Sequence, residues 1–167
     1  MMAQKLFLKR EGEKVVLTDS EKNAEVVVVC LKDNRPAVET ILLPVFNTHE
    51  GIAIYFEDLE EALTKDKHFF AGYGEGTGKN NAMDATRGAL FSLIKAGGRA
   101  DEKTKYVFLH FSCSKDTTFY AMVTAMDFLK TRLSADVKIF FGQSYDAEGV
   151  EIAKCVMLTS AAGSVKN

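Results

Sequence analysis

Several features are missing from this sequence, and each absence narrows what the chain can be. No apolar run approaches the roughly 20 residues that a membrane-spanning helix needs. Charges occur within the first ten residues, and no apolar segment followed by small residues marks a cleavable leader. Low-complexity stretches and flexible linkers are also missing. We therefore expect a cytoplasmic protein without a membrane partner.

The charges show no excess of either sign. The 167 residues include 21 basic and 23 acidic side chains, which leaves a formal net charge of −2. A nucleic-acid-binding domain usually carries a clear excess of positive charge. We therefore expect no nucleic-acid partner.

Cysteine and histidine are too few and too scattered to suggest a bound metal. An odd number of widely spaced cysteines does not indicate a disulfide framework, and no histidine pair has ligand spacing. We expect buried thiols, no metal and no cofactor; the alternative is a metal site or a thiol nucleophile. The residues concerned are Cys30, Cys113, Cys155, His49, His68 and His110.

The first 50 residues are rich in β-type segments. Lys5–Lys9 and Lys14–Thr18 predict a hairpin with Gly12 in its turn. The four consecutive valines within Glu25–Lys32 predict a strand buried on both faces. The segment VETILLPVF that follows favours a returning strand, although it could begin a helix that Pro44 interrupts.

Helical and β-type segments alternate in the remainder, which predicts an α/β (α+β) fold, a mixed sheet with packed helices. With 47% hydrophobic residues the chain can bury one core. The expected elements are a helix with Phe56, Leu59 and Leu63 on one face, a strand from His68 into a glycine-rich turn, a helix at Asn80–Ala96, a strand at Tyr106–Ser112, a helix at Thr117–Ser134, and strands at Val137–Gly142 and Glu151–Thr159.

Five segments between residues 51 and 163 resemble, in order, the C-terminal domain of the tubulin/FtsZ family. They are IYFEDLEEAL, FAGYGEGTG with Gly72, Gly74 and Gly78, YVFLHFS, IFFGQSYD with Phe141, Gly142 and Asp146, and CVMLTSAAG. The resemblance implies that family's fold over about two-thirds of the chain. It also implies two parts: an N-terminal β-rich extension (1–50) packed on the main domain, and an FtsZ C-terminal-like domain (51–167).

The resemblance also bears on catalysis. In that family a separate N-terminal domain holds GTP, and an acidic loop of the neighbouring subunit completes hydrolysis. Here Ala53 stands at the family's Asn position and Tyr55 at its first Asp position, so only Asp58 remains. Alanine cannot orient water, and a tyrosine is neutral near pH 7. The catalytic role is expected to be lost; Asp58 could instead favour its helix N-terminus through the dipole.

The glycine-rich segment 72–78 has two possible readings. Glycine-rich backbone ahead of a helix can bind an anion, which makes Gly72, Gly74, Gly76, Gly78 and Lys79 the candidate ligand-binding residues. The P-loop pattern fails, because Tyr73 and Asn80 replace its first glycine and its Ser or Thr. The simpler reading is structural: glycine permits unusual backbone angles and close helix packing.

The segment SCSKDTT (112–118) links a strand to a helix, as the turn of a nucleophile would. Cys113 would need a base, and His110 is expected on the same strand face. Capping of the following helix by Asp116 or Thr117 is the simpler interpretation.

These observations favour a non-catalytic assembly or interaction module that binds itself, as a homo-oligomer, or a tubulin/FtsZ-like protein. A link to cell division or filament regulation is what the resemblance implies. The alternative is a small-molecule or nucleotide-binding protein, or an enzyme, that uses the glycine turn 72–78 or a subunit interface. A third reading places the function in residues 1–50, as strands that pair with another chain.

Overall fold

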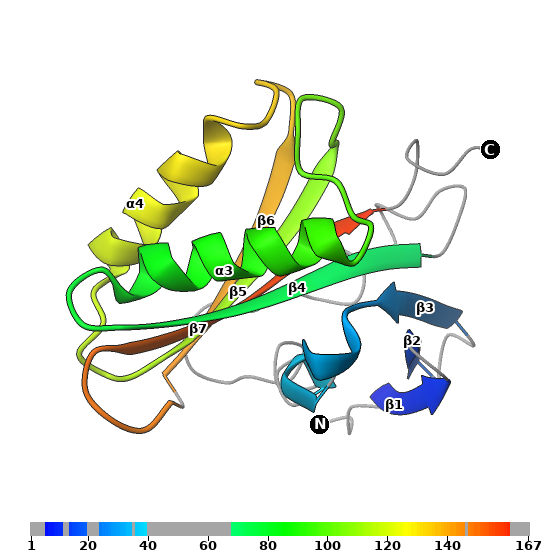
Figure 1. Cartoon of the computed structure of the whole chain (residues 1–167), viewed down its shortest axis with the longest axis horizontal. Helices are drawn as coiled ribbons and strands as arrows, with labels where there is room; N and C mark the ends of the chain where they lie inside the picture. Colours follow the sequence, from blue (N-terminus) through cyan, green and yellow to red (C-terminus); the bar gives the residue numbers. More distant parts are fainter. Residues whose placement is uncertain are drawn as a thin grey trace, which may run out of the picture.

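A computed structural model of the chain shows one mixed β-sheet with helices packed on it (Figure 1). It describes residues 6–11, 14–19, 24–34, 36–39, 68–145 and 147–160. The elements in these ranges are the strands β1 (Leu6–Glu11), β2 (Lys14–Asp19), β3 (Ala24–Val29), β4 (His68–Thr77), β5 (Tyr106–Cys113), β6 (Lys138–Ser144) and β7 (Ile152–Ser160), the helices α3 (Asn81–Lys95) and α4 (Phe119–Lys130), and the 3-10 turn η1 (Lys32–Asn34). The predicted α/β class with a mixed sheet is confirmed.

The seven described strands lie in the order β1-β2-β3-β4-β7-β5-β6. β7 is the last strand in the chain, yet it lies between β4 and β5 and runs antiparallel to both. β5 and β6 are parallel, and α4 provides the crossover between them. This arrangement brings the ends of β4, β5 and β6 close to the start of β7.

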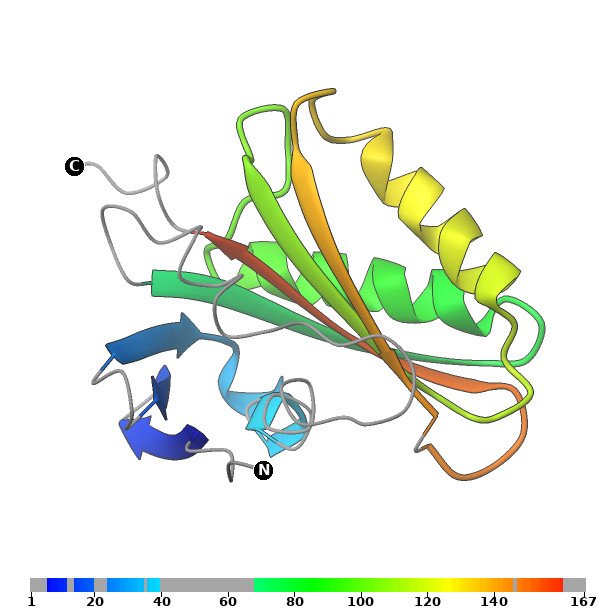
Figure 2. The same cartoon turned by 180° about the vertical axis from the view of Figure 1, so that it is seen from behind.

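The helices α3 and α4 cover the same face of the sheet (Figures 1 and 2). Alternate residues of β5 point to this face, because side chains along a strand alternate between its two sides. They pack with β7 residues and with the small side chains of α3 into one buried core, which includes Val107, Leu109, Phe111, Cys113, Cys155, Met157, Ala85, Ala89 and Met122. No helix in the described ranges is long and apolar enough to cross a bilayer.

The opposite face of the sheet carries an aromatic stack and one buried histidine. The Phe69 and Phe108 rings meet edge to face at 5.3 Å, and the Phe108 and Phe140 rings stack at 4.7 Å. The imidazole of His110 lies 3.1 Å from the Ser144 hydroxyl, with both side chains buried. This face is therefore also part of the protein interior.

The N-terminal strands join the same sheet. β1 and β2 form the predicted antiparallel hairpin, β2 pairs with β3, and β3 runs parallel to β4 over three residue pairs. Val15, Val16 and Val28 are buried. Residues 36–39 are helical, so the returning strand does not begin at Val38 as the sequence favoured; residues 40–67 lie outside the described ranges.

The glycine-rich segment differs most from the sequence-based expectation. The predicted turn is instead strand, because β4 continues through Gly72, Gly74 and Gly76 to Thr77. Antiparallel pairing with β7 runs without interruption from Phe69 to Thr77. The turn begins only at Gly78, where φ is +88°.

Candidate functional site

Three of the five predicted ligand-binding residues lie against a helix. A Cβ added to Gly72 would lie 1.8 Å from the Ala89 carbonyl oxygen, and one added to Gly74 would lie 2.1 Å from that of Ala85. A Cβ at Gly76 would lie 2.1 Å from the Asn81 carbonyl oxygen. No real Cβ tolerates such distances, so glycine lets the α3 backbone rest directly on β4.

The other two predicted ligand-binding residues lie in the turn before α3. An added Cβ at Gly78 would meet no atom within 4 Å, although its positive φ favours glycine. The Gly78 N–H donates to the Glu151 carbonyl oxygen at 2.9 Å, and Lys79 is exposed. The structure therefore separates the five candidates into a packed group and an accessible pair.

The remaining acidic candidate, Asp58, lies outside the described residues, as do Ala53, Tyr55 and Asp146. The expectation that the acidic loop has lost its catalytic role therefore stays a prediction.

The predicted relation between Cys113 and His110 is wrong. Three positions separate them along β5, so strand alternation puts them on opposite faces. Cys113 lies in the core beneath α3 and α4, whereas His110 contacts Ser144 on the other face. His110 therefore does not reach the Cys113 thiol as a base.

All three cysteines are buried thiols, as predicted. Burial raises the pKa of the Cys155 thiol, which also hydrogen-bonds to the Thr86 side chain. In the described ranges no three His, Cys, Asp or Glu side chains lie close enough to hold a metal ion. Cys113 and Cys155 therefore pack as core residues.

The segment between β5 and α4 caps its helix differently from the prediction. Thr118, and not Asp116 or Thr117, occupies the N-cap, where its side chain accepts from the Ala121 N–H at 3.1 Å. Asp116 and Thr117 instead bond outside the helix, because their side chains point to the loop before β7. The sequence correctly indicated a capping segment but not its residue.

A polar cluster connects three loops at this end of the sheet. The Asn81 amide at the start of α3 donates to the Thr117 hydroxyl at 2.9 Å. The Ile152 N–H at the start of β7 donates to the Ser114 hydroxyl at 2.9 Å. Both Asp116 carboxylate oxygens accept from the Glu151 N–H at 3.0 Å. The loops after β4 and β5 and the loop before β7 are thereby held together.

The Asp116 carboxylate is the charged centre of that cluster. The Ser114 hydroxyl donates to it at 2.6 Å, and this bond, followed by the Glu151 N–H, lowers the pKa of Asp116 below its usual value. The carboxylate is therefore ionised at neutral pH. This cluster is a set of structural contacts, because each group named here bonds to another part of the chain.

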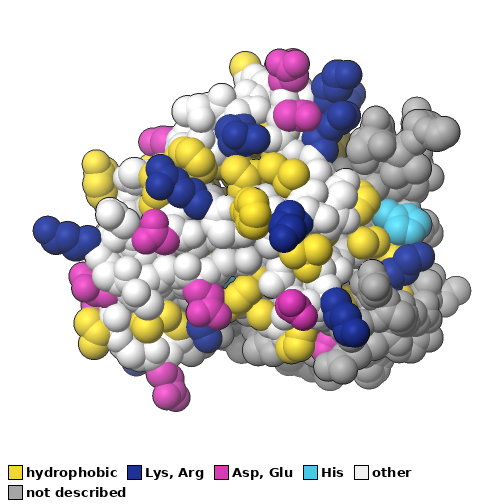
Figure 3. Space-filling view, in the orientation of Figure 1, with side chains coloured by type: hydrophobic (Ala, Val, Ile, Leu, Met, Phe, Trp, Pro, Cys, Tyr) yellow, Lys and Arg dark blue, Asp and Glu magenta, His cyan; other side chains and the backbone are white. Residues whose placement is uncertain are grey.

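The accessible surface offers a different kind of candidate site. Large apolar side chains are exposed on the two helices and on the loop before β7: Phe91 by 66%, Ile94 by 44%, Phe119 by 50%, Tyr120 by 78% and Val150 by 74%. Figure 3 shows hydrophobic side chains gathered on the helix side of the molecule, with Lys and Arg among them. Such groups are typical of protein contact surfaces.

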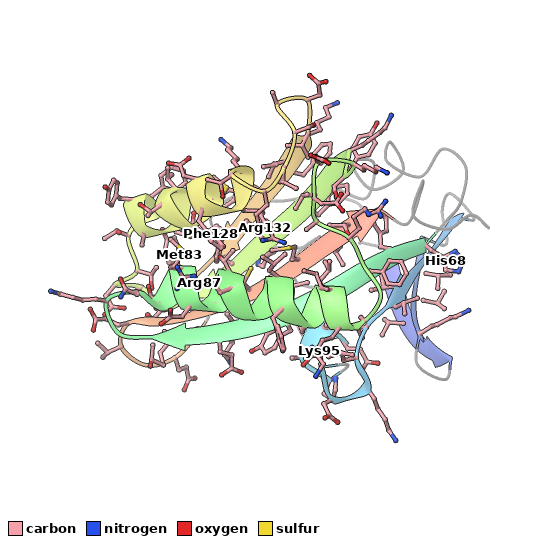
Figure 4. All side chains as sticks on the ribbon, turned by 45° about the horizontal axis from the view of Figure 1, so that its top comes forward. His68, Met83, Arg87, Lys95, Phe128 and Arg132 are labelled. Atoms are coloured by element: carbon pink, nitrogen blue, oxygen red, sulfur yellow. The ribbon has the colours of Figure 1, made fainter. Side chains whose placement is uncertain are left out.

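Cations accompany the apolar residues on α3 and α4. The Arg87 guanidinium lies 5.2 Å from the centre of the Phe128 ring, and the Lys95 ammonium lies 5.4 Å from that of Phe91. Figure 4 shows Met83 and Arg87 of α3 beside Phe128 and Arg132, with Lys95 farther along α3. This surface was not predicted, although the three- and four-residue spacing of Arg87, Phe91 and Ile94 indicates a common helix face.

A hollow of about 540 Å³ lies where β5 and β6 begin. Three lysines and two acids line it, with Tyr106 and two hydroxyl side chains: Glu102, Lys103, Thr104, Lys105, Tyr106, Ser134, Asp136 and Lys138. It lies at the opposite end of the strands from Gly78 and Lys79, so it does not extend the glycine turn into a larger site.

The fold is similar to that of known proteins. Two solved structures of FtsZ from M. jannaschii, an empty dimer and a single-substitution mutant, align with TM-scores of 0.62 and 0.61. Sequence identity is 17% and 18%, and the matches cover 81% and 80% of this chain but 41% and 42% of the FtsZ chains. No family model and no curated protein sequence matches. The predicted resemblance is thus confirmed at the level of fold, and the partial coverage is consistent with a C-terminal-domain-like part of FtsZ.

Proposed function

We propose that this chain, which shares its fold with part of FtsZ, is a non-catalytic assembly module that binds copies of itself or a tubulin/FtsZ-like protein. A role in cell division or filament regulation would follow from such binding. The proposal depends on one observation, the exposed apolar side chains of α3, α4 and the loop before β7. Exposed apolar groups that form a patch mark sites of association.

Two further points support binding over chemistry. One of the similar FtsZ structures is a dimer. In the described part of this chain, the polar cluster around Ser114 and Asp116 is engaged in structural hydrogen bonds, so its side chains hold loops together.

Sedimentation velocity over a wide concentration range tests self-association, and co-sedimentation with FtsZ polymers tests the second partner. We expect either a mass that rises with concentration or a change in the amount of FtsZ polymer. A single monomeric species that also leaves FtsZ assembly unchanged would contradict the proposal. GTP hydrolysis by the purified chain alone would contradict its non-catalytic part.

The small-molecule alternative would depend on Gly78 and Lys79, since the other candidate glycines pack against α3. A position just before a helix N-terminus and the exposed Lys79 favour an anion. Titration with a nucleoside triphosphate tests this, with amide signals of residues 72–80 as the readout. Shifts confined to Gly78 and Lys79 that disappear in Lys79→Ala would support it, and an unchanged spectrum would exclude it.

A further inference from the structure

The loop before β7 ends in a small acidic tip, which we define as Glu148, Val150 and Glu151. All three side chains are exposed, and Val150 stands between the two glutamates. An apolar side chain flanked by two carboxylates is best complemented by a hydrophobic surface that carries cations, because opposite charges across a contact attract. The tip therefore has a definite chemical complement.

The backbone of Glu151 anchors the acidic tip to the neighbouring loops. Glu151 has φ +52°, which few residues other than glycine adopt. Its N–H donates to Asp116 and its carbonyl oxygen accepts from the Gly78 N–H, so the strained backbone is fixed on both sides. A loop ordered before binding loses less conformational entropy on association. Strain of this kind is often found at functional positions.

The basic patch on the two helices has the complementary character. We define it as Arg87, Phe91, Ile94 and Lys95 of α3 with Phe128 and Arg132. Within the described part of the chain, no ion pair engages Arg87, Lys95 or Arg132. Asp84 and Asp127 are exposed acids of the same helices, but the cations Arg87, Lys95, Lys130 and Arg132 outnumber them.

The acidic tip and the basic patch lie at different ends of α3. The hydrogen bond from Gly78 to Glu151 puts the tip beside the N-terminal end of α3, whereas Phe91, Ile94 and Lys95 are in its last two turns. A helix of 15 residues is about 22 Å long. The acidic tip of one molecule therefore lies far from the Phe91, Ile94 and Lys95 part of its own basic patch.

We propose that the acidic tip of one copy docks on the basic patch of a second copy. Val150 would contact Phe91 and Ile94, while Glu148 and Glu151 would face Lys95 and Arg87. A patch-to-patch dimer would oppose like charges, which disfavours it. Because the two surfaces differ, the contact is heterologous and repeats into a ring or an open chain. This inference depends on the self-association proposed above and specifies its surfaces.

Charge reversal on each side tests the docking. One variant is R87E/K95E and the other is E148K/E151K; the matched control K103E/K105E reverses two exposed lysines before β5. Sedimentation velocity is recorded for each variant alone and for the patch variant R87E/K95E mixed with the tip variant E148K/E151K, in low and high salt. Circular dichroism and the denaturation midpoint verify folding.

We expect the patch variant and the tip variant, each alone, to associate at least about tenfold more weakly than the native chain, because each then presents two surfaces of the same sign. The equimolar mixture should recover association, since its acidic and basic surfaces alternate. The control should behave as the native chain does, and high salt should weaken native association because the paired charges are exposed.

Three results would overturn the docking model: native-like association of both the patch variant and the tip variant, a mixture that associates no more strongly than its components, or a native chain that stays monomeric. The first two leave self-association intact and reject only these surfaces. In the third case, binding to FtsZ polymers would still support the proposed function through its other partner.

Discussion

Gly74 shows how strongly one residue can constrain this fold. A Cβ at this position would lie 2.1 Å from the Ala85 carbonyl oxygen and 2.5 Å from the Ala89 amide nitrogen, so only backbone could move away. Overpacking of this kind costs about 1–3 kcal/mol or more. We therefore expect Gly74→Ala to lower the free energy of unfolding by about 3 kcal/mol.

Chemical denaturation measures that loss, with Thr77→Ala as the control because Thr77 is exposed on the same strand. A Gly74→Ala protein as stable as the control would show that α3 can move away from β4 at little cost.

At the residue scale, Asp116 makes the stability of the folded chain depend on pH. Its pKa is lowered from the usual 3.8, first by the Ser114 hydroxyl and then by the Glu151 N–H, so the ionised form is favoured in the folded chain. Its contribution to stability is complete above that usual value and disappears as the pH falls through the lower folded value. The Glu151 amide signal should therefore titrate with a midpoint below 3.8.

In Asp116→Asn the same Glu151 signal should stop titrating, while amides distant from the loop keep their native pH response. A midpoint at or above the usual aspartate value would mean that these hydrogen bonds do not form in solution.

At the scale of single elements, the start of α4 depends on its cap. The Thr118 side chain accepts from the Ala121 N–H, which would otherwise have no partner within the helix. Removing such a cap costs about 1 kcal/mol. We expect Thr118→Ala to lose about that amount in thermal and urea unfolding.

Thr124→Ala provides the matched control within the same helix. Thr124 is exposed and its hydroxyl bonds to the Tyr120 carbonyl oxygen of its own helix, so alanine there should be neutral or slightly stabilising. Equal losses in the two variants would argue against a capping role for Thr118.

The elements themselves were largely readable from the sequence. A nearly continuous apolar run predicted β5, which is buried on both of its faces. Three- and four-residue spacing predicted α3, because burial along one side of a helix imposes that period. The continuation of β4 through Gly72–Thr77 was not predictable, because glycine marks turns far more often than strands and only the pairing with β7 fixes its conformation. The opposite faces of Cys113 and His110 required only strict counting along β5.

On the scale of the whole molecule, the N-terminal strands β1, β2 and β3 extend the sheet beyond β4. β3 joins β4 over three residue pairs, and Val15, Val16 and Val28 are buried. Removing residues 1–19 would expose the β3 edge and part of that apolar surface. We expect the shortened chain to have a lower denaturation midpoint and a greater tendency to aggregate, as measured by urea unfolding and light scattering.

The full-length chain measured under the same conditions is the control. An unchanged midpoint would show that β1 and β2 add no stability. A loss of self-association in the shortened chain would instead support a role for these strands in pairing with another chain.

The contact surfaces emerge only at this scale. Phe91 and Val150 are far apart in the sequence, and no periodic pattern relates them. Their common exposure depends on where the sheet order places α3 and the start of β7. Sequence reasoning could anticipate the FtsZ-like fold and the structural use of its glycines, but not which apolar side chains remain accessible.

The contact between β4 and α3 has a consequence for ancestry. Gly72, Gly74 and Gly76 each meet helix backbone, so any descendant that keeps this contact must keep glycine at all three alternate positions, however far its other residues diverge. Where overall identity falls to the level separating this chain from FtsZ, three glycines at two-residue intervals ahead of an alanine-rich helix would serve as a fingerprint for finding its kin.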